Sequence, residues 1–375
     1  MKEIFIIGCG FVADLYMKSL ATFPDIKIVS AYDRNPARLG AFSSHWNVPA
    51  AQSINAIVDA EPKGRLVLNL TNPDQHYEVS RLCLEAGHHV YSEKPLATRM
   101  DDAYALHALA AERGLMLASA PCSVISEAAQ TLGAALRAEI CGAPRLIYAE
   151  LDDDFIPQAP YAKWFSESGA PWPYDDEMRV GCTLEHAGYY LTWLIGLFGT
   201  VRTVVAASAD IIPDKLEGGG AAPDFSTATL FFETGLVARL TCSIIAPHDH
   251  RIRVFGDNGV LEARDAWNNE AAIRYRSRFS IRKRLLNNPF SRHIKLKGPT
   301  HPKVPRTGAA SMNFALGPAE MLDALAEGRP ARLSADFALH LNEVTLAIQN
   351  SRDEAGVQHM HTRCDPIEPM PWATL

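Results

Sequence analysis

The chain has 375 residues and a net charge of -7 at pH 7, with 47% hydrophobic and 21% charged residues. This length exceeds what one hydrophobic core usually supports, so we expect two domains. The ordinary composition excludes collagen, a long coiled coil and global disorder, and no apolar run approaches the roughly 20 residues that span a bilayer.

The chain opens with MKEIFIIGCG, which lacks the long apolar region and the small-residue cleavage site of a signal peptide. We therefore expect a first strand and a cytoplasmic protein. The seven cysteines are odd in number and scattered, without a CxxC pair, which predicts free thiols and no metal site. They are Cys9, Cys83, Cys122, Cys141, Cys182, Cys242 and Cys364.

Short apolar runs alternate with helical patterns over the first 120 residues. Such alternation predicts crossover units and a doubly wound parallel sheet, and hence a Rossmann-type α/β domain over residues 1–122. The expected strands are 3–7, 26–33, 65–71, 88–94 and 115–120, and the expected helices begin near residues 11, 36, 75 and 100.

The first strand leads into GCGFVA, which fits the G-x-G-x-x-G/A pattern of dinucleotide-binding turns. Gly8 allows a tight turn, Gly10 lets the backbone approach a pyrophosphate, and Ala13 permits close packing of the helix on the strand. The first helix starts at Phe11 and Val12, and its free N–H groups would face the phosphates.

Asp33 closes the second strand, 20 residues after the motif, where a carboxylate accepts hydrogen bonds from the adenosine ribose. This carboxylate favours NAD, because it would repel a 2′-phosphate. The adjacent Arg34 could accept that phosphate, so NADP stays open as the alternative cofactor.

The residues from 123 to 375 read as a second domain for substrate binding and oligomerisation. A helix at 126–142 precedes a strand at 145–153, and later period-two stretches predict a large, mostly antiparallel open sheet. Those stretches are 201–211, 225–233, 236–245 and 251–263, and two helices follow between 317 and 351.

The segment 152–177 is irregular and rich in proline, tryptophan and acid. Trp164 and Trp172 offer flat faces that suit pyranose rings, so the segment could close over a sugar-like substrate. They could equally anchor a long loop to the domain.

Residues 271–306 contain eleven lysines and arginines and no acid, so the rest of the chain carries a net charge of -18 (-7 minus 11). The simplest interpretation is a solvated loop at a sheet edge. The alternative is a surface for anionic lipid, centred on 274–297, or for a phosphate-bearing substrate. Nucleic acid is not expected, because no recognition fold accompanies the charge.

Four stretches of the chain together resemble the motifs of a known family. They are GCGFVA, residues 69–97 with EKP at 93–95, residues 181–199 and the closing GRPARLSADFALHLNEVTLAIQNS. On these motifs the chain resembles the Gfo/Idh/MocA oxidoreductases over nearly its whole length. The resemblance implies an N-terminal domain that holds a nicotinamide cofactor and a C-terminal sheet that often forms the oligomer. It also implies sugars, polyols or nucleotide-linked sugars as substrates.

Carried onto matching positions, the resemblance places Lys94 at the substrate carbinol and both Glu93 and Lys94 beside the cofactor. An ammonium there would stabilise negative charge on the oxygen. Thr71, Asn72 and His76 match the loop that lines the nicotinamide side of the cofactor.

The stretch GCTLEHAGYYLTW departs from the common Asp-x-Gly-x-His run of the family: aligned on Gly188, it has His186 for the aspartate and Tyr190 for the histidine. Helical spacing of i to i+4 predicts both side chains on one face, with Glu185 and Tyr189 facing elsewhere. Tyr190, assisted by Lys94, is the predicted acid/base. His186 is the alternative acid/base, or a ligand or relay for substrate hydroxyls.

Cys122 follows the last strand of the first domain and is predicted as a small substrate contact, without a base to make it a nucleophile. We predict an NAD(P)-dependent dehydrogenase or reductase acting on CH–OH groups, and a homo-oligomer, dimer or tetramer, through the C-terminal sheet. One alternative is a reductase of a nucleotide- or lipid-linked keto sugar. Another is a dinucleotide-binding sensor or regulatory protein of the same fold without turnover.

Overall fold

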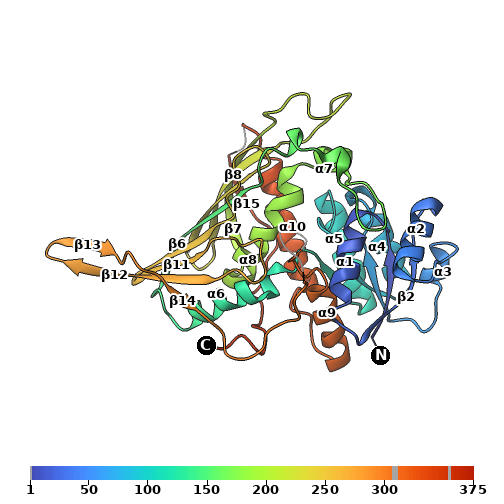
Figure 1. Ribbon diagram of the computed structural model, residues 1–375, viewed down its shortest axis with the longest axis horizontal. Coiled ribbons are helices and arrows are strands. Elements are labelled where there is room, and N and C mark those ends of the chain that lie inside the picture. Colours follow the sequence, from blue (N-terminus) through green and yellow to red (C-terminus); the bar gives the residue numbers. More distant parts are fainter. Residues whose placement is uncertain (1, 306–310, 354–355) are drawn as a thin grey trace.

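The computed structural model describes residues 2–305, 311–353 and 356–375. Its N-terminal part is a five-stranded parallel sheet in the order β2-β1-β3-β4-β5, as the alternating pattern predicts (Figure 1). The strands are β1 (Lys2–Ile7), β2 (Ile26–Tyr32), β3 (Leu66–Asn69), β4 (His89–Ser92) and β5 (Leu117–Ser119). The helices are α1 (Phe11–Leu20), α2 (Pro36–Trp46), α3 (Asn55–Val58), α4 (His76–Glu85) and α5 (Met100–Arg113), with a 3₁₀ turn, η1 (Pro73–Gln75).

The C-terminal part is built on a ten-stranded mixed sheet, in which β6 and β9 pair in parallel and the other pairs are antiparallel. The predicted strands are present as β6 (Pro144–Asp152), β7 (Val201–Ala209), β8 (Phe225–Phe232), β9 (Val237–Ser243), β10 (Ile252–Gly256) and β11 (Gly259–Ala263). The helical elements are α6 (Glu127–Arg137), α7 (Tyr174–Val180), α8 (Gly188–Phe198), α9 (Leu316–Glu327) and α10 (Ala335–Gln349), with shorter turns η2 (Ser123–Ile125), η3 (Ile156–Gln158), η4 (Tyr161–Lys163) and η5 (Thr183–Ala187).

The basic segment is exposed and lies at a sheet edge, as expected, but it contains a β-hairpin and is not a loop. β12 (Ile273–Ile281) extends the sheet beyond β11, folds back through β13 (Arg284–Asn287) and also pairs with β14 (Arg292–Ile294). The hairpin projects far from the body (Figure 1). The frequent arginines hid a strand whose alternation is between charged residues and Tyr, Ser and Phe. Arg306 lies outside the described residues, and β15 (Val357–His359) at the other sheet edge was not predicted.

α10 lies between the two sheets and joins them (Figure 1). Its Ala338 and Leu339 belong to the buried cluster on one face of the N-terminal sheet. Its Asn342 accepts a hydrogen bond from the backbone N–H of Ala97. The last helix of the chain therefore completes the core of the first sheet, and a domain division at residue 122 stays a prediction.

All seven cysteines are free, as predicted. No helix within the described ranges combines the length and apolar character needed to cross a bilayer.

Candidate active site

A cavity of about 560 Å³ lies between the N-terminal sheet, the 152–177 segment and the start of α8. Parallel strands of an open sheet commonly place ligands beyond their carboxyl ends, and the loops after β1, β3 and β4 all reach this cavity. Of the residues that the sequence predicted, Gly10, Phe11, Val12, Thr71, Asn72, Glu93, Lys94, Trp164, Trp172 and His186 line it.

The glycine turn fits a dinucleotide. A Cβ on Gly8 would lie 2.4 Å from the Leu70 carbonyl oxygen, and Gly8 has a φ of +99°, so only glycine suits this position. A Cβ on Gly10 would meet nothing within 4 Å, which leaves open space before α1. No side chain caps α1, so its first N–H groups are free to bind phosphate oxygens.

Asp33 follows β2 and accepts hydrogen bonds from the backbone N–H groups of Cys9 (2.9 Å) and Asn35 (2.8 Å). These bonds hold the carboxylate beside the glycine turn. Arg38, rather than the exposed Arg34, lines the cavity, and its guanidinium lies 3.7 Å from Asp33. The cation that lies beside Asp33 in the cavity lining is therefore Arg38 of α2, one helical turn after Arg34.

Lys94 forms an ion pair with Glu185 across the cavity floor. Burial would lower the pKa of Lys94, but the charges of Glu185 and Glu177 raise it above its usual value. Burial and the neighbouring charge of Glu185 raise the pKa of Glu177 well above its usual value. Lys94 therefore keeps its charge at neutral pH, and burial favours the protonated form of Glu177.

A π-helical turn, Thr183–Ala187, precedes α8 and changes which side chains share a face. Glu185, His186 and Tyr189 line the cavity, so the expectation that Glu185 and Tyr189 face elsewhere was wrong. Tyr190 does not line the cavity: it is fully buried in the core, and its hydroxyl has no hydrogen-bond partner. The structure therefore does not bring Tyr190 to the lysine.

Tyr189 lines the cavity at the place that the sequence predicted for Tyr190. Its ring packs on Trp267, with centroids 4.3 Å apart. Burial raises the pKa of Tyr189, while the charge of Lys94 lowers it. The phenol consequently holds its proton at neutral pH and interacts electrostatically with the lysine.

His186 faces the cavity, with its Nδ1 3.5 Å from Oδ2 of Asp153, which also lines the cavity. Burial lowers the pKa of His186, although Asp153 opposes this. The imidazole is therefore neutral at pH 7 and can donate or accept a hydrogen bond with a hydroxyl group.

The 152–177 segment closes one side of the cavity and docks on the N-terminal domain. Trp164 and Trp172 pack edge to face, 5.1 Å apart, and both line the cavity. The backbone N–H of Ser168 donates to Asp14 of α1 (2.7 Å), and Lys18 pairs with Glu167. Ser168 and Glu167 thus anchor the segment while both tryptophans face the cavity, and contact of the tryptophans with a substrate ring stays a prediction.

Several predicted residues lie outside the cavity. His76 is buried, and its ring nitrogens contact the carbonyls of Pro95 (2.7 Å) and Thr71 (2.9 Å), so it holds the loop in place. Cys122 is buried with its sulfur near the carbonyls of Asn313 and Phe314. Ala13 packs in the core. Among described residues, none from 271 to 305 lines the cavity.

Sequence reasoning did not place Arg38, Glu185, Tyr189, Trp267 and Phe314 in the cavity. Trp267 and Phe314 come from distant loops whose approach depends on the tertiary fold. Asp153 and Glu177 belong to the acidic segment 152–177, which was expected to close over the substrate.

Comparisons with known proteins agree with this geometry. A family model described as "Oxidoreductase family, NAD-binding Rossmann fold" matches residues 2–120, and one described as "GFO/IDH/MocA C-terminal domain" matches residues 129–262. The trans-1,2-dihydrobenzene-1,2-diol dehydrogenase of Mus musculus is 23% identical over 269 residues, 70% of this chain and 74% of that protein.

Two solved structures share the fold. An oxidoreductase from Agrobacterium radiobacter, in complex with NAD+, L-tartaric acid and magnesium, has a TM-score of 0.74 at 15% identity and covers 96% of this chain and 98% of its own. The WlbA dehydrogenase from Bordetella pertussis, in complex with NADH and UDP-GlcNAcA, has a TM-score of 0.71 at 18% identity, covering 96% and 99%.

Proposed function

Because the chain belongs to the Gfo/Idh/MocA oxidoreductase family, an NAD(P)-binding enzyme family that acts on CH–OH groups, we propose that it oxidises or reduces one secondary alcohol or ketone of a sugar-like substrate. The observation that carries this proposal is the charged Lys94 in a cavity bounded by the phosphate-binding turn on one side and by tryptophans on the other. A bound nicotinamide supplies the hydride exchange. The residues of this chain orient the substrate and handle its oxygen.

Lys94 is proposed to stabilise negative charge on the carbinol oxygen. Its ammonium is held by Glu185 and reaches the cavity from the end of β4, where the chain is fixed by the hydrogen bond from the Lys94 N–H to Glu93 (3.0 Å). A preorganised charge in a buried site is worth more than in water, because water does not have to reorganise around it.

Tyr189, not Tyr190, is proposed to donate a proton to the substrate oxygen during reduction. It lines the cavity, it lies in the field of Lys94, and its raised pKa keeps the proton in place at neutral pH. His186 is proposed to bind a second substrate hydroxyl, as the sequence suggested.

The aromatic lining supports a ring-shaped polyol or sugar. Trp164, Trp172 and Trp267 all line the cavity, and acidic side chains that accept hydroxyl hydrogen bonds lie among them, namely Asp153, Asp176 and Glu177. Such a lining suits alternating CH faces and hydroxyl edges better than a wholly apolar substrate. A sensor without turnover is disfavoured, because the lysine and its carboxylates are retained in the cavity.

The test follows the absorbance of reduced nicotinamide while polyols, sugars, sugar acids and nucleotide sugars are added to the purified protein. Lys94→Ala is expected to lower kcat/KM for the active substrate by about 10²-fold or more, while the cofactor Kd changes little. Lys27→Ala, an exposed lysine on β2, is the matched control. Turnover in no member of the panel, or turnover that survives Lys94→Ala, would count against the proposal.

We also propose a homo-oligomer through the open face of the C-terminal sheet. The exposed side chains on this face include Val205 of β7 and Val357 of β15, which lie directly opposite each other in the sheet. Exposed apolar residues on a sheet that stays uncovered favour association. Light scattering should show a mass that falls on Val205→Glu; an unchanged mass would contradict this interface.

A further inference from the structure

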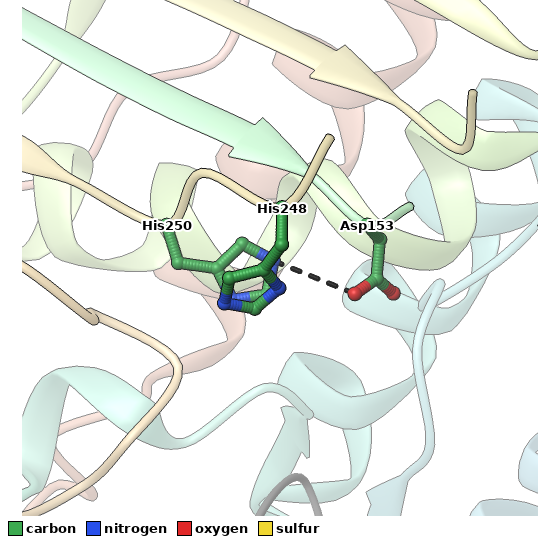
Figure 2. Close-up of side chains that lie close together, drawn as sticks. All are labelled: Asp153, His248 and His250. Atoms are coloured by element: carbon green, nitrogen blue, oxygen red, sulfur yellow. Dashed lines mark ion pairs between the residues drawn. The ribbon is translucent and has the colours of Figure 1, made fainter. Parts of the chain in front are cut away.

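A second cluster of chemically competent side chains lies beside the cavity, where the chain after β6 runs against the chain before β10 (Figure 2). Asp152 and Asp249 form an antiparallel bridge, with backbone hydrogen bonds of 3.1 and 3.0 Å. That register sets Asp153 opposite His248. His250 is two residues further along, so the three side chains share one face of the strand pair.

The three residues offer ligand atoms at metal-binding separations. One nitrogen of each histidine and one carboxylate oxygen of Asp153 all lie within 4.8 Å of one another. Figure 2 shows the two imidazole rings overlapping beside the carboxylate; the ring centroids are 3.9 Å apart. Two nitrogens and one oxygen form a donor set typical of zinc and similar divalent transition metals.

His250 supplies an independent indication of a missing ligand. Only 2% of its surface is exposed, yet neither of its ring nitrogens has a hydrogen-bond partner. Its Nε2 lies 3.5 Å from Asp153 Oδ1, without hydrogen-bond geometry, and its Nδ1 lies 3.9 Å from Asp265. Buried polar groups are nearly always paired, because leaving one unpaired costs free energy.

We propose that Asp153, His248 and His250 bind one divalent transition-metal ion of the zinc class. The ion would bond Nε2 of His250 and Oδ1 of Asp153, while Asp265 faces the other ring nitrogen and fixes the ring orientation, as acidic partners of metal-bound histidines do. Three protein ligands leave at least one position open to water or an oxygen donor.

The proposed ion lies at the edge of the substrate cavity, since Asp153 lines both sites and turns Oδ2 toward His186. The scattered cysteines predicted no metal site, and this proposal departs from that prediction. The sequence signal for a site is HDH at 248–250, which puts two histidines on one side of an extended segment.

The test is calorimetric titration of the chelator-treated full-length protein with Zn²⁺ alone, with Co²⁺ absorption as a second readout. We expect one ion per chain, and an affinity at least tenfold lower in His248→Ala and in Asp153→Asn. His248 is exposed, so the fold should tolerate its replacement. His361→Ala, another exposed histidine, is the matched control and should bind as the unmodified chain does.

Two results would overturn the metal site: no Zn²⁺ binding above that of the His248→Ala variant, or Mg²⁺ competing as well as Zn²⁺, since Mg²⁺ prefers oxygen ligands. The inference does not depend on the reaction proposed above. Lys94→Ala should abolish turnover and keep the metal, so the two proposals can fail separately.

The hairpin of β12 and β13 carries a different inference. Leu285 and Leu286 point to opposite faces of β13, yet they are 65% and 42% exposed, and Phe290 beyond it is 83% exposed. The same segment carries Arg278, Arg282, Lys283, Arg284 and Arg292 and no acid. A protein partner lying on one face would leave the other face exposed, whereas insertion of the tip into a lipid interface would bury both.

We propose that this tip inserts at the surface of an anionic membrane. Bulky apolar side chains would enter the interface, and the surrounding cations would meet lipid phosphates. The remainder of the chain carries a net charge of -18, so an anionic surface would attract the tip and repel the body.

Co-sedimentation with vesicles tests this proposal. We expect binding to phosphatidylcholine vesicles containing phosphatidylglycerol, weak binding to phosphatidylcholine alone, and release at high salt. The double variant Leu285→Ser with Phe290→Ser should lose the binding, while Ile211→Ser, an exposed isoleucine just after β7, should keep it. No binding at low salt, or a tip variant that changes the oligomeric mass instead, would refute the membrane role.

Discussion

Lys94 and Glu185, 91 positions apart in the chain, form an ion pair that joins the end of β4 to the π-helical turn before α8. Burial and the charge of Glu185 raise the pKa of Glu177, which favours the protonated form of this acid. The buried ammonium of Lys94 thus interacts electrostatically with two carboxyl groups, those of Glu185 and Glu177.

This arrangement predicts that the two glutamates substitute for each other. Glu177→Gln should be nearly neutral, since it replaces an already uncharged acid. Glu185→Gln should be milder than loss of an ion pair, because Glu177 can then ionise beside Lys94. The double variant leaves a buried ammonium unpaired and should lower the free energy of unfolding by about 3–5 kcal/mol. Urea unfolding of the three variants measures this; additive effects would contradict it.

Adjacent tyrosines provide a matched pair for the proton donor. Tyr189→Phe should lower kcat by about 10²-fold or more and keep the cofactor affinity. Tyr190→Phe should keep the activity and raise the free energy of unfolding by up to about 1 kcal/mol, because it removes a buried hydroxyl without a partner. Steady-state kinetics and thermal melts distinguish them. If Tyr190→Phe is inactive and Tyr189→Phe is active, Tyr190 is the acid/base, as the sequence predicted.

The two motif glycines should separate folding from cofactor binding. Gly8→Ala places a Cβ against the Leu70 carbonyl at positive φ, so it should destabilise the fold by at least about 2 kcal/mol. Gly10→Ala meets no neighbour and should cost about 1 kcal/mol or less, yet its methyl group would occupy the pyrophosphate approach. NADH fluorescence titration should show an affinity loss of tenfold or more. Unchanged NADH binding by Gly10→Ala would contradict the role of Gly10 at the pyrophosphate.

Cofactor choice should depend on Asp33 and Arg38. Asp33→Asn removes the negative charge near the ribose while retaining a carbonyl acceptor for one of its two backbone donors. The ratio of kcat/KM for NADP over NAD should rise about tenfold. Adding Arg38→Ala should reverse the gain, whereas adding Arg34→Ala should not. If Arg34→Ala reverses the gain and Arg38→Ala does not, the cation at the 2′-phosphate is Arg34, as the sequence suggested.

His340 should make the folded chain less stable at acid pH. It is buried in α10, accepts a hydrogen bond from the Val201 N–H (3.0 Å), and burial lowers its pKa to about 4. Glu343 and Thr362 oppose this shift without reversing it. The folded chain binds fewer protons than the unfolded chain between pH 6.5 and about 4, so stability is full above 6.5 and falls with decreasing pH.

The expected slope from this one group is at most about 1.4 kcal/mol per pH unit. His340→Gln should flatten that part of the profile and lower the plateau above pH 6.5. Urea midpoints at successive pH values provide the measurement, and parallel profiles for the two proteins would refute the role of His340.

The sequence predicted the parallel sheet, the glycine turn and Lys94, because each depends on local pattern or on a motif of fixed spacing. It placed Tyr190 where Tyr189 lies, because i to i+4 reasoning assumes an α-helix and the π turn at 183–187 rotates the later residues. The hydrophobic pattern of the sequence does not predict such a turn. Trp267 was not predicted for another reason: pairings between distant strands bring it to the cavity.

The position of α10 has a consequence for how the chain is made. Ala338 and Leu339 complete a core whose other members are residues 5 to 117, so the first sheet emerges from the ribosome more than 200 residues before its cover does. In the meantime, an apolar face around Leu96, Ala97 and Leu106 has no final partner. Nascent chains stopped before residue 335 should therefore bind chaperones and resist digestion less than the finished protein, even though they contain every strand of the nucleotide-binding sheet.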